Sequence, residues 1–145
     1  MDKLPHHYRV DASATPGGAI ATATDEGAGL EVDAPAQFGG EPGGWSPEHL
    51  LTSSLASCFA LTFKAIAAAS GLEWKSLQAG AEGTLDKIDR AMQFTAFHID
   101  ATLTVPAGTN RDRAVEALER AERHCLVTNT LKCPVTLAVS IEIPD

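Results

Sequence analysis

Three cysteines are the residues best suited to carry chemistry in this 145-residue chain. They are Cys58, Cys125 and Cys133, and successive members are 67 and 8 positions apart. An odd number at this spacing does not match the disulfide framework of a small secreted protein, and no CxxC or His-rich pattern predicts a zinc or other metal site. Redox-active thiols and plain buried cysteines remain, because free cysteine is among the most buried residue types.

A long helix is predicted to position the first of these thiols. Ser46-Pro47-Glu48 is a helix start, with a hydroxyl N-cap, a proline where no amide hydrogen is needed, and an acid at the positive end of the helix dipole. The pattern predicts a helix that continues to Ser70 and stops at Gly71. Cys58 lies in its middle, ten residues after Glu48.

This predicted helix is apolar nearly all round. From residue 50 to residue 69 its polar side chains are small hydroxyls and Lys64. A 145-residue monomer cannot easily cover such a helix on every side, so a second copy of the chain is a reasonable source of the missing contacts. No window approaches the roughly eighteen apolar residues of a membrane span, and the N-terminus lacks the apolar core of a signal peptide. We therefore expect a cytoplasmic protein without membrane contact.

The rest of the chain reads as strands and one further helix. Alternation of apolar and polar residues, broken by turn residues, separates the strands, and the second helix carries Cys125 on its inward side. This order argues for an α+β fold with a largely antiparallel sheet and for a single domain over 1–145. The expected elements are a meander over 8–33, a loop over 34–44, a hairpin of 72–86 and 90–105 around a turn near 87–89, a helix over about 109–126, and a last strand over about 135–143.

Charge excludes one class of function. The formal net charge is −8, and the acids are scattered rather than gathered in a tail. A phosphate backbone would be repelled by such a surface. Nucleic acid is therefore not an expected partner.

Two motifs at compatible spacing resemble a known family. The pattern PE-x-L-(x)₇-CF over 47–59 resembles the helix that carries the peroxidatic cysteine of the OsmC/Ohr family, the osmotically inducible and organic hydroperoxide resistance proteins. The pattern C-x-x-[ST]-N over 125–129 resembles the segment with the family's second cysteine. The likeness extends over nearly the whole chain, including the order of elements.

The resemblance implies a fold and a reaction. The implied fold is an intertwined homodimer in which mainly antiparallel sheets wrap around two long central helices, with two active sites at the subunit interface. In the implied reaction the Cys58 thiolate attacks an organic hydroperoxide, lipid or aromatic, and becomes a sulfenic acid, which Cys125 captures as a disulfide. The family needs no bound cofactor; an external dithiol, commonly a lipoyl group of a carrier protein, restores the thiols.

The resemblance also assigns roles around the cysteine. Glu48 corresponds to the active-site acid, which orients an arginine and the thiolate, although an acid in a first helical turn is also explained by the dipole alone. Trp45, Leu51 and Phe59 are the candidates for substrate binding, with loop packing as the alternative for Trp45. On one straight helix Glu48 and Cys58 would be about 15 Å apart. Either the regular helix begins after Glu48, or the acid of one subunit serves the cysteine of the other.

The family's arginine is absent from both places where it is expected. Gly17-Gly18 is followed by Ala19, and residues 31–47 contain no arginine or lysine. We expect another cation near the Cys58 sulfur, because burial alone would disfavour a thiolate. The missing arginine also supports an alternative function, an apolar-ligand-binding or redox-sensing dimer without efficient peroxidase turnover. The cations that could substitute are Arg9, Arg90, Arg123, Lys64 and Lys132, with His49 and His124 as weaker ones.

Overall fold

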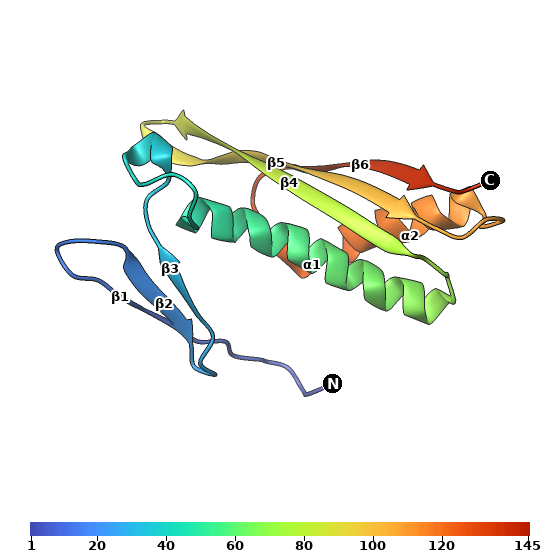
Figure 1. The fold of residues 1–145 in the computed structure, drawn as a ribbon, viewed down its shortest axis with the longest axis horizontal. Coiled ribbons are helices and arrows are strands. Elements are labelled where there is room, and N and C mark those ends of the chain that lie inside the picture. Colours follow the sequence, from blue (N-terminus) through green and yellow to red (C-terminus); the bar gives the residue numbers. More distant parts are fainter. The chain divides into compact units, whose positions relative to one another are not determined.

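The computed structural model describes all residues from Met1 to Asp145 and divides into two compact units. Unit 1 is Met1–Leu51 and unit 2 is Thr52–Asp145 (Figure 1). The division falls within the first turns of helix α1, which spans Pro47–Ser70. The single domain over 1–145 stays a prediction.

Unit 1 is built on a small antiparallel meander, as predicted. Its strands pair in the order β1-β2-β3. After the last strand the chain turns through a short 3-10 helix, and Val32 pairs with Trp45 in an isolated bridge just before α1. The bounds are β1 Val10–Ser13, β2 Ile20–Thr24, β3 Gly29–Val32 and η1 Ala36–Phe38.

Helix α1 begins and ends at the predicted residues. The backbone N–H of His49 donates to Ser46 Oγ at 3.1 Å, which is an N-cap, and the Ser46 hydroxyl lies 2.6 Å from His49 Nδ1. At the other end Gly71 has a φ of 68°, a left-handed conformation that stops the helix at little steric cost. The whole segment from Pro47 to Ser70 is therefore one regular helix.

The apolar character of α1 exceeds the sequence expectation. By length and composition α1 is apolar enough to cross a membrane, so the expectation that no segment reaches that length is wrong. The reason is physical: its many alanines are themselves apolar, its small hydroxyls lower the hydropathy little, and Lys64 is its one charged residue after the first turn. A core helix of a soluble protein passes the same test, but only 22% of this window is buried within the chain. Most of the helix surface therefore lacks a covering layer.

Unit 2 contains the larger sheet, in the order β4-β5-β6. Strands β4 (Ser76–Ile88) and β5 (Ala91–Thr104) form the predicted antiparallel hairpin. Its turn lies at Asp89-Arg90, later than predicted, because both residues have a positive φ, which joins the strands in a two-residue turn. Strand β6 (Val135–Glu142) pairs parallel to β5, so the sheet is mixed rather than wholly antiparallel.

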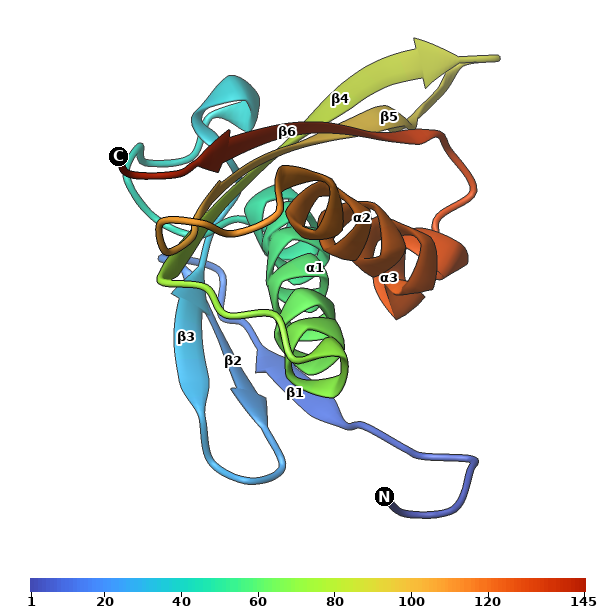
Figure 2. The same ribbon diagram turned by 90° about the vertical axis from the view of Figure 1, so that its right-hand side faces the viewer.

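Helices α1 and α2 cover one face of this sheet, as Figures 1 and 2 show from two sides. Helix α2 (Arg111–His124) is capped by Asn110, whose side chain accepts from the Arg113 N–H at 3.1 Å. The predicted single helix to residue 126 is interrupted, since Cys125 is extended and a separate short helix α3 (Leu126–Thr130) follows. The α+β fold predicted from the sequence is confirmed.

The core lies between these helices and the sheet. Helix α1 contributes residues at four-residue spacing, which form one face, and β5 contributes alternating positions. Cys125 is fully buried among them, as predicted. The fully buried members are Leu55, Phe59, Phe63 and Ala67 from α1, Ile99 and Leu103 from β5, and Ala114, Leu118 and Ala121 from α2.

Candidate functional site

The fold of unit 2 brings Cys58 and Cys125 together. Cys58 is half-buried on α1, beside the core face of that helix, and Cys125 is fully buried at the junction of α2 and α3. The two side chains lie close enough for each thiol to influence the pKa of the other, and all three thiols of the chain are free. The prediction that these two cysteines form a pair is therefore supported by geometry, despite the long chain between them.

The two thiols differ in acidity. Burial raises the pKa of Cys58, but hydrogen bonds outweigh this effect, so the pKa lies below the ordinary value. The donors are the backbone of Val127, the thiol of Cys125, the side chain of Thr62 and the backbone of Leu126. Burial likewise raises the pKa of Cys125, and the neighbouring Cys58 raises it further, against hydrogen bonds from Thr128. The two shifts favour Cys58 as the thiolate of the pair and Cys125 as the protonated thiol.

The donors around the sulfur of Cys58 are neutral. The strongest influences on its pKa are burial and hydrogen bonds, with two backbone N–H groups of α3 among them, rather than a guanidinium or ammonium group. Two of the cations that could replace the family's arginine form ion pairs elsewhere. Arg9 pairs with Asp11 at 2.6 Å, and Arg123 pairs with Glu116 at 3.1 Å. Within one chain the donors to this sulfur include backbone amides, and the expected cation, which the partner subunit could supply, stays a prediction.

Two threonines complete the surroundings of the thiol pair. The Thr62 hydroxyl, one helical turn after Cys58, donates to the Cys58 carbonyl oxygen at 2.7 Å. Because a hydroxyl has one proton, Thr62 can donate either to that carbonyl or to the sulfur. We favour the carbonyl, for which the geometry is explicit. The Thr128 hydroxyl is buried beside Cys125 and lowers the pKa of that thiol.

The start of helix α1 excludes one of the two alternatives for Glu48. Since α1 begins at Pro47, the possibility that the regular helix starts after Glu48 is excluded. Ten residues of helix rise separate it from Cys58 by about 15 Å along the axis. Within unit 1 its carboxyl group lines a cavity of about 270 Å³ with Val32 and Phe38. A role beside Cys58 therefore needs the partner subunit and stays a prediction.

The three predicted substrate contacts lie in different environments. Trp45 and Leu51 are 45% and 37% exposed and can meet a ligand from solvent. Phe59 is fully buried in the core of unit 2, so its side chain packs the fold in this chain rather than facing a cavity. Cys133 is half-buried against the same core.

The sequence reasoning missed the groups that set the acidity of Cys58. Thr62 could have been found, because its spacing of four residues places it over Cys58 on the helix. The amides of Leu126 and Val127 carry no side-chain signal, and only the break at Cys125 turns them toward the sulfur.

These donors lead to a prediction about pH. Leu126→Pro deletes one N–H donor at a position where proline fits, because Leu126 is the first residue of α3, Cys125 before it is extended and the Leu126 side chain is 69% exposed. We expect the pKa of Cys58, measured from the rate of alkylation against pH, to rise in this variant and to stay unchanged in Leu126→Ala, which keeps the N–H. In the parent chain the midpoint should lie below that of an ordinary cysteine thiol. Equal midpoints in the two variants would contradict a role for this amide.

Comparisons with known proteins agree with this fold. Residues 39–140 match the family described as OsmC-like protein. The peroxiredoxin OsmC of Escherichia coli is 28% identical over 101 residues, which are 70% of this chain and 69% of that protein. An OsmC-like protein from Vibrio cholerae superposes with a TM-score of 0.84 at 17% identity, over 94% of this chain and 100% of that one. An organic hydroperoxide resistance protein OsmC from Legionella pneumophila superposes with a TM-score of 0.76 at 20% identity, over 97% of this chain and 99% of that one.

The fold and the paired thiols define a two-cysteine α+β protein of the OsmC/Ohr type. By the match over 39–140, the chain belongs to the OsmC-like protein family. The family is linked to peroxiredoxin activity and to organic hydroperoxide resistance.

Proposed function

We propose that this protein is a thiol-dependent peroxidase that reduces organic hydroperoxides. The observation that carries the proposal is the close pair of free thiols at the core, whose pKa values are shifted in opposite directions. An acidic, half-buried thiol is suited to attack, and a protonated neighbour in contact with it is suited to resolve the product. The alternative of a ligand-binding protein with inert thiols gives no reason for a lowered pKa at Cys58.

The proposed reaction has two steps in the protein. The Cys58 thiolate attacks the outer oxygen of R–O–O–H, the O–O bond breaks, and the leaving alkoxide takes a proton to give the alcohol and Cys58 sulfenic acid. The Cys125 sulfur then attacks the Cys58 sulfur, and a disulfide forms with release of water. An external dithiol, with a lipoyl group as the expected example, is oxidised as it restores both thiols.

We further propose that the working form is a homodimer. The support is the uncovered surface of α1, of which little is buried within one chain. Leu61, for example, is 65% exposed in the middle of this helix. A second copy packed on that face would bury it, and could bring the partner's Glu48 to Cys58. We propose Glu48, Cys58 and Cys125 as the catalytic residues, with Trp45 and Leu51 as substrate contacts.

A single-turnover experiment tests the peroxidase proposal. One equivalent of cumene hydroperoxide should convert the reduced protein to a form with a Cys58–Cys125 disulfide, which peptide mass spectrometry identifies, while Cys133 stays free. The same amount of hydrogen peroxide should react more slowly, because the surroundings of Cys58 are largely apolar. Peptides in which all three thiols remain reduced after exposure to the organic hydroperoxide would exclude the proposal.

A further inference from the structure

Cys125 has to lose a proton before its sulfur can attack, and its surroundings oppose that loss. The thiol is fully buried in the core, at the break between α2 and α3. Burial raises its pKa, and the neighbouring Cys58 raises it further. A buried thiol without compensation stays protonated and is a poor nucleophile. The resolving step therefore needs a group that stabilises the Cys125 sulfur as negative charge develops on it.

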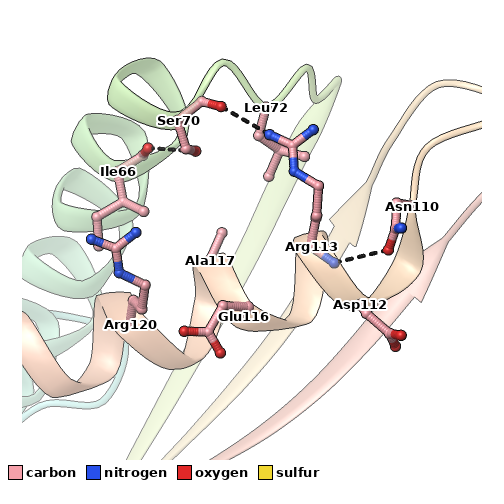
Figure 3. A pocket seen from close by; sticks show the side chains of 9 residues that line it. All are labelled: Ile66, Ser70, Leu72, Asn110, Asp112, Arg113, Glu116, Ala117 and Arg120. Atoms are coloured by element: carbon pink, nitrogen blue, oxygen red, sulfur yellow. Dashed lines mark hydrogen bonds between the residues drawn. The ribbon is translucent and has the colours of Figure 1, made fainter.

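The position of Cys125 is fixed by the helix that precedes it. In its first turn α2 is tied to the end of α1, because the Arg113 guanidinium donates to the Ser70 carbonyl oxygen at 2.8 Å (Figure 3). Between that contact and Cys125, the buried residues Leu118 and Ala121 pack α2 against the core. Because α2 is held at both places, Cys125 has to ionise in its present surroundings.

One hydroxyl in those surroundings is buried without an ordinary partner. The side-chain oxygen of Thr128 is shielded from solvent and forms no hydrogen bond to a nitrogen or oxygen atom of the chain. Its neighbour is the Cys125 sulfur, and the hydroxyl and the backbone N–H of Thr128 both lower the pKa of that thiol. A buried hydroxyl with only a thiol as its partner costs free energy in the resting protein. That cost is explained if the hydroxyl has its use in the reaction.

The break between the two helices explains why the Thr128 hydroxyl is left for the sulfur. A threonine inside a helix usually donates to the carbonyl oxygen four residues earlier. Thr130, on the same short helix, does so, with Leu126 as its partner at 2.9 Å. The equivalent carbonyl for Thr128 belongs to His124, which lies in α2 on the other side of the extended residue Cys125. The back-bond that Thr130 forms is thus missing at Thr128.

We infer that the Thr128 hydroxyl donates a hydrogen bond to the Cys125 sulfur while that sulfur attacks oxidised Cys58, and so accelerates disulfide formation. The inference rests on the proposed peroxidase function and adds to it a residue for the resolving step. The S–S bond forms as the S–O bond of the Cys58 sulfenic acid breaks, and the released hydroxide takes the proton that Cys125 gave up and leaves as water. A donor already aimed at the sulfur stabilises its developing charge without reorganisation.

A chromogenic aromatic disulfide tests the role of Thr128 without any peroxide. In a Cys133→Ser background, Cys58 attacks the reagent and releases one coloured thiolate, and Cys125 then attacks the mixed disulfide and releases a second. Thr128→Val, which keeps the shape and removes the hydroxyl, should leave the first release unchanged and slow the second about ten- to a hundredfold. Thr128→Ser should keep the parent rates. Thr130→Val should keep them too, because the Thr130 hydroxyl is bonded to a backbone carbonyl.

The pH dependence of the second release separates this role from a packing role. The rate of that release rises with pH as Cys125 ionises. Loss of a donor to the thiolate raises the pKa of Cys125, so the midpoint should move to higher pH in Thr128→Val. A purely structural role would slow both releases and leave the midpoint in place. That result, or a second release in Thr128→Val as fast as in the parent, would overturn the inference.

The inference and the proposed function can fail separately, because the chromogenic disulfide requires no peroxidase activity. If Thr128→Val slows the second release while the parent protein consumes no organic hydroperoxide, the role of Thr128 in resolution stands and the peroxidase proposal is wrong. If the parent consumes hydroperoxide and Thr128→Val resolves the mixed disulfide at the parent rate, the peroxidase proposal stands and the role of Thr128 is wrong.

Discussion

Replacement of Cys58 by serine is expected to reduce turnover of organic hydroperoxides by about a thousandfold or more, to the rate without protein. A serine hydroxyl accepts the same hydrogen bonds but is not ionised near neutral pH, so no nucleophile remains. Steady-state consumption of cumene hydroperoxide with an excess of dithiol is the measurement. Turnover that survives in Cys58→Ser would exclude the mechanism.

Two matched variants sharpen this result. Cys125→Ser should still consume one equivalent of hydroperoxide, because Cys58 is intact, but should stop at the sulfenic acid, which a dimedone-type reagent labels. Cys133→Ser should turn over as the parent protein does, since Cys133 lies outside the thiol pair. If Cys133→Ser were as inactive as Cys58→Ser, the assignment of the resolving thiol would be wrong.

Replacement of Phe59 by alanine is expected to lower the free energy of unfolding by about 3–5 kcal/mol. The Phe59 side chain is fully buried in the core, with a relative exposure of 0%, so its truncation leaves a cavity between α1 and the sheet. Urea unfolding of the reduced protein is the measurement. The size of this effect also tests whether Phe59 serves packing rather than substrate contact.

A surface residue of similar size provides the control for Phe59. Met92 on β5 is 61% exposed, and Met92→Ala should change the free energy of unfolding by no more than about 0.5 kcal/mol. A loss below about 1 kcal/mol in Phe59→Ala, together with a raised KM for hydroperoxide, would contradict the packing role and favour substrate contact.

Local signals explain which elements could be predicted from the sequence. Ser46, Pro47 and Gly71 mark the ends of α1, and strict alternation marks β5 and β6, so these elements were predicted correctly. The turn at Asp89-Arg90 was misplaced because Arg90, unlike Asp89, is not a usual left-handed residue and gives no turn signal. The parallel pairing of β6 depends on the crossover through α2, which no local pattern encodes.

In the candidate site, too, the groups marked by a side-chain pattern could be predicted and the backbone donors could not. The pairing of Cys58 with Cys125 was predictable from motifs, because each cysteine is a side chain at a fixed spacing. Two of the donors that lower the pKa of Cys58 are backbone groups of Val127 and Leu126, which any residue but proline supplies. Their direction depends on the extended conformation of Cys125, and that is a property of the fold rather than of the sequence around it.

The neutral donors around Cys58 have a consequence for the conditions under which the thiol is reactive. A thiolate held by an exposed guanidinium loses stabilisation as ionic strength rises, because mobile ions screen the pair over a Debye length of about 8 Å at 0.15 M. Backbone N–H groups in contact with a half-buried sulfur are dipoles fixed at short range, and dissolved ions do not come between them and the sulfur. The reactivity of Cys58 should therefore vary little between dilute buffer and concentrated salt.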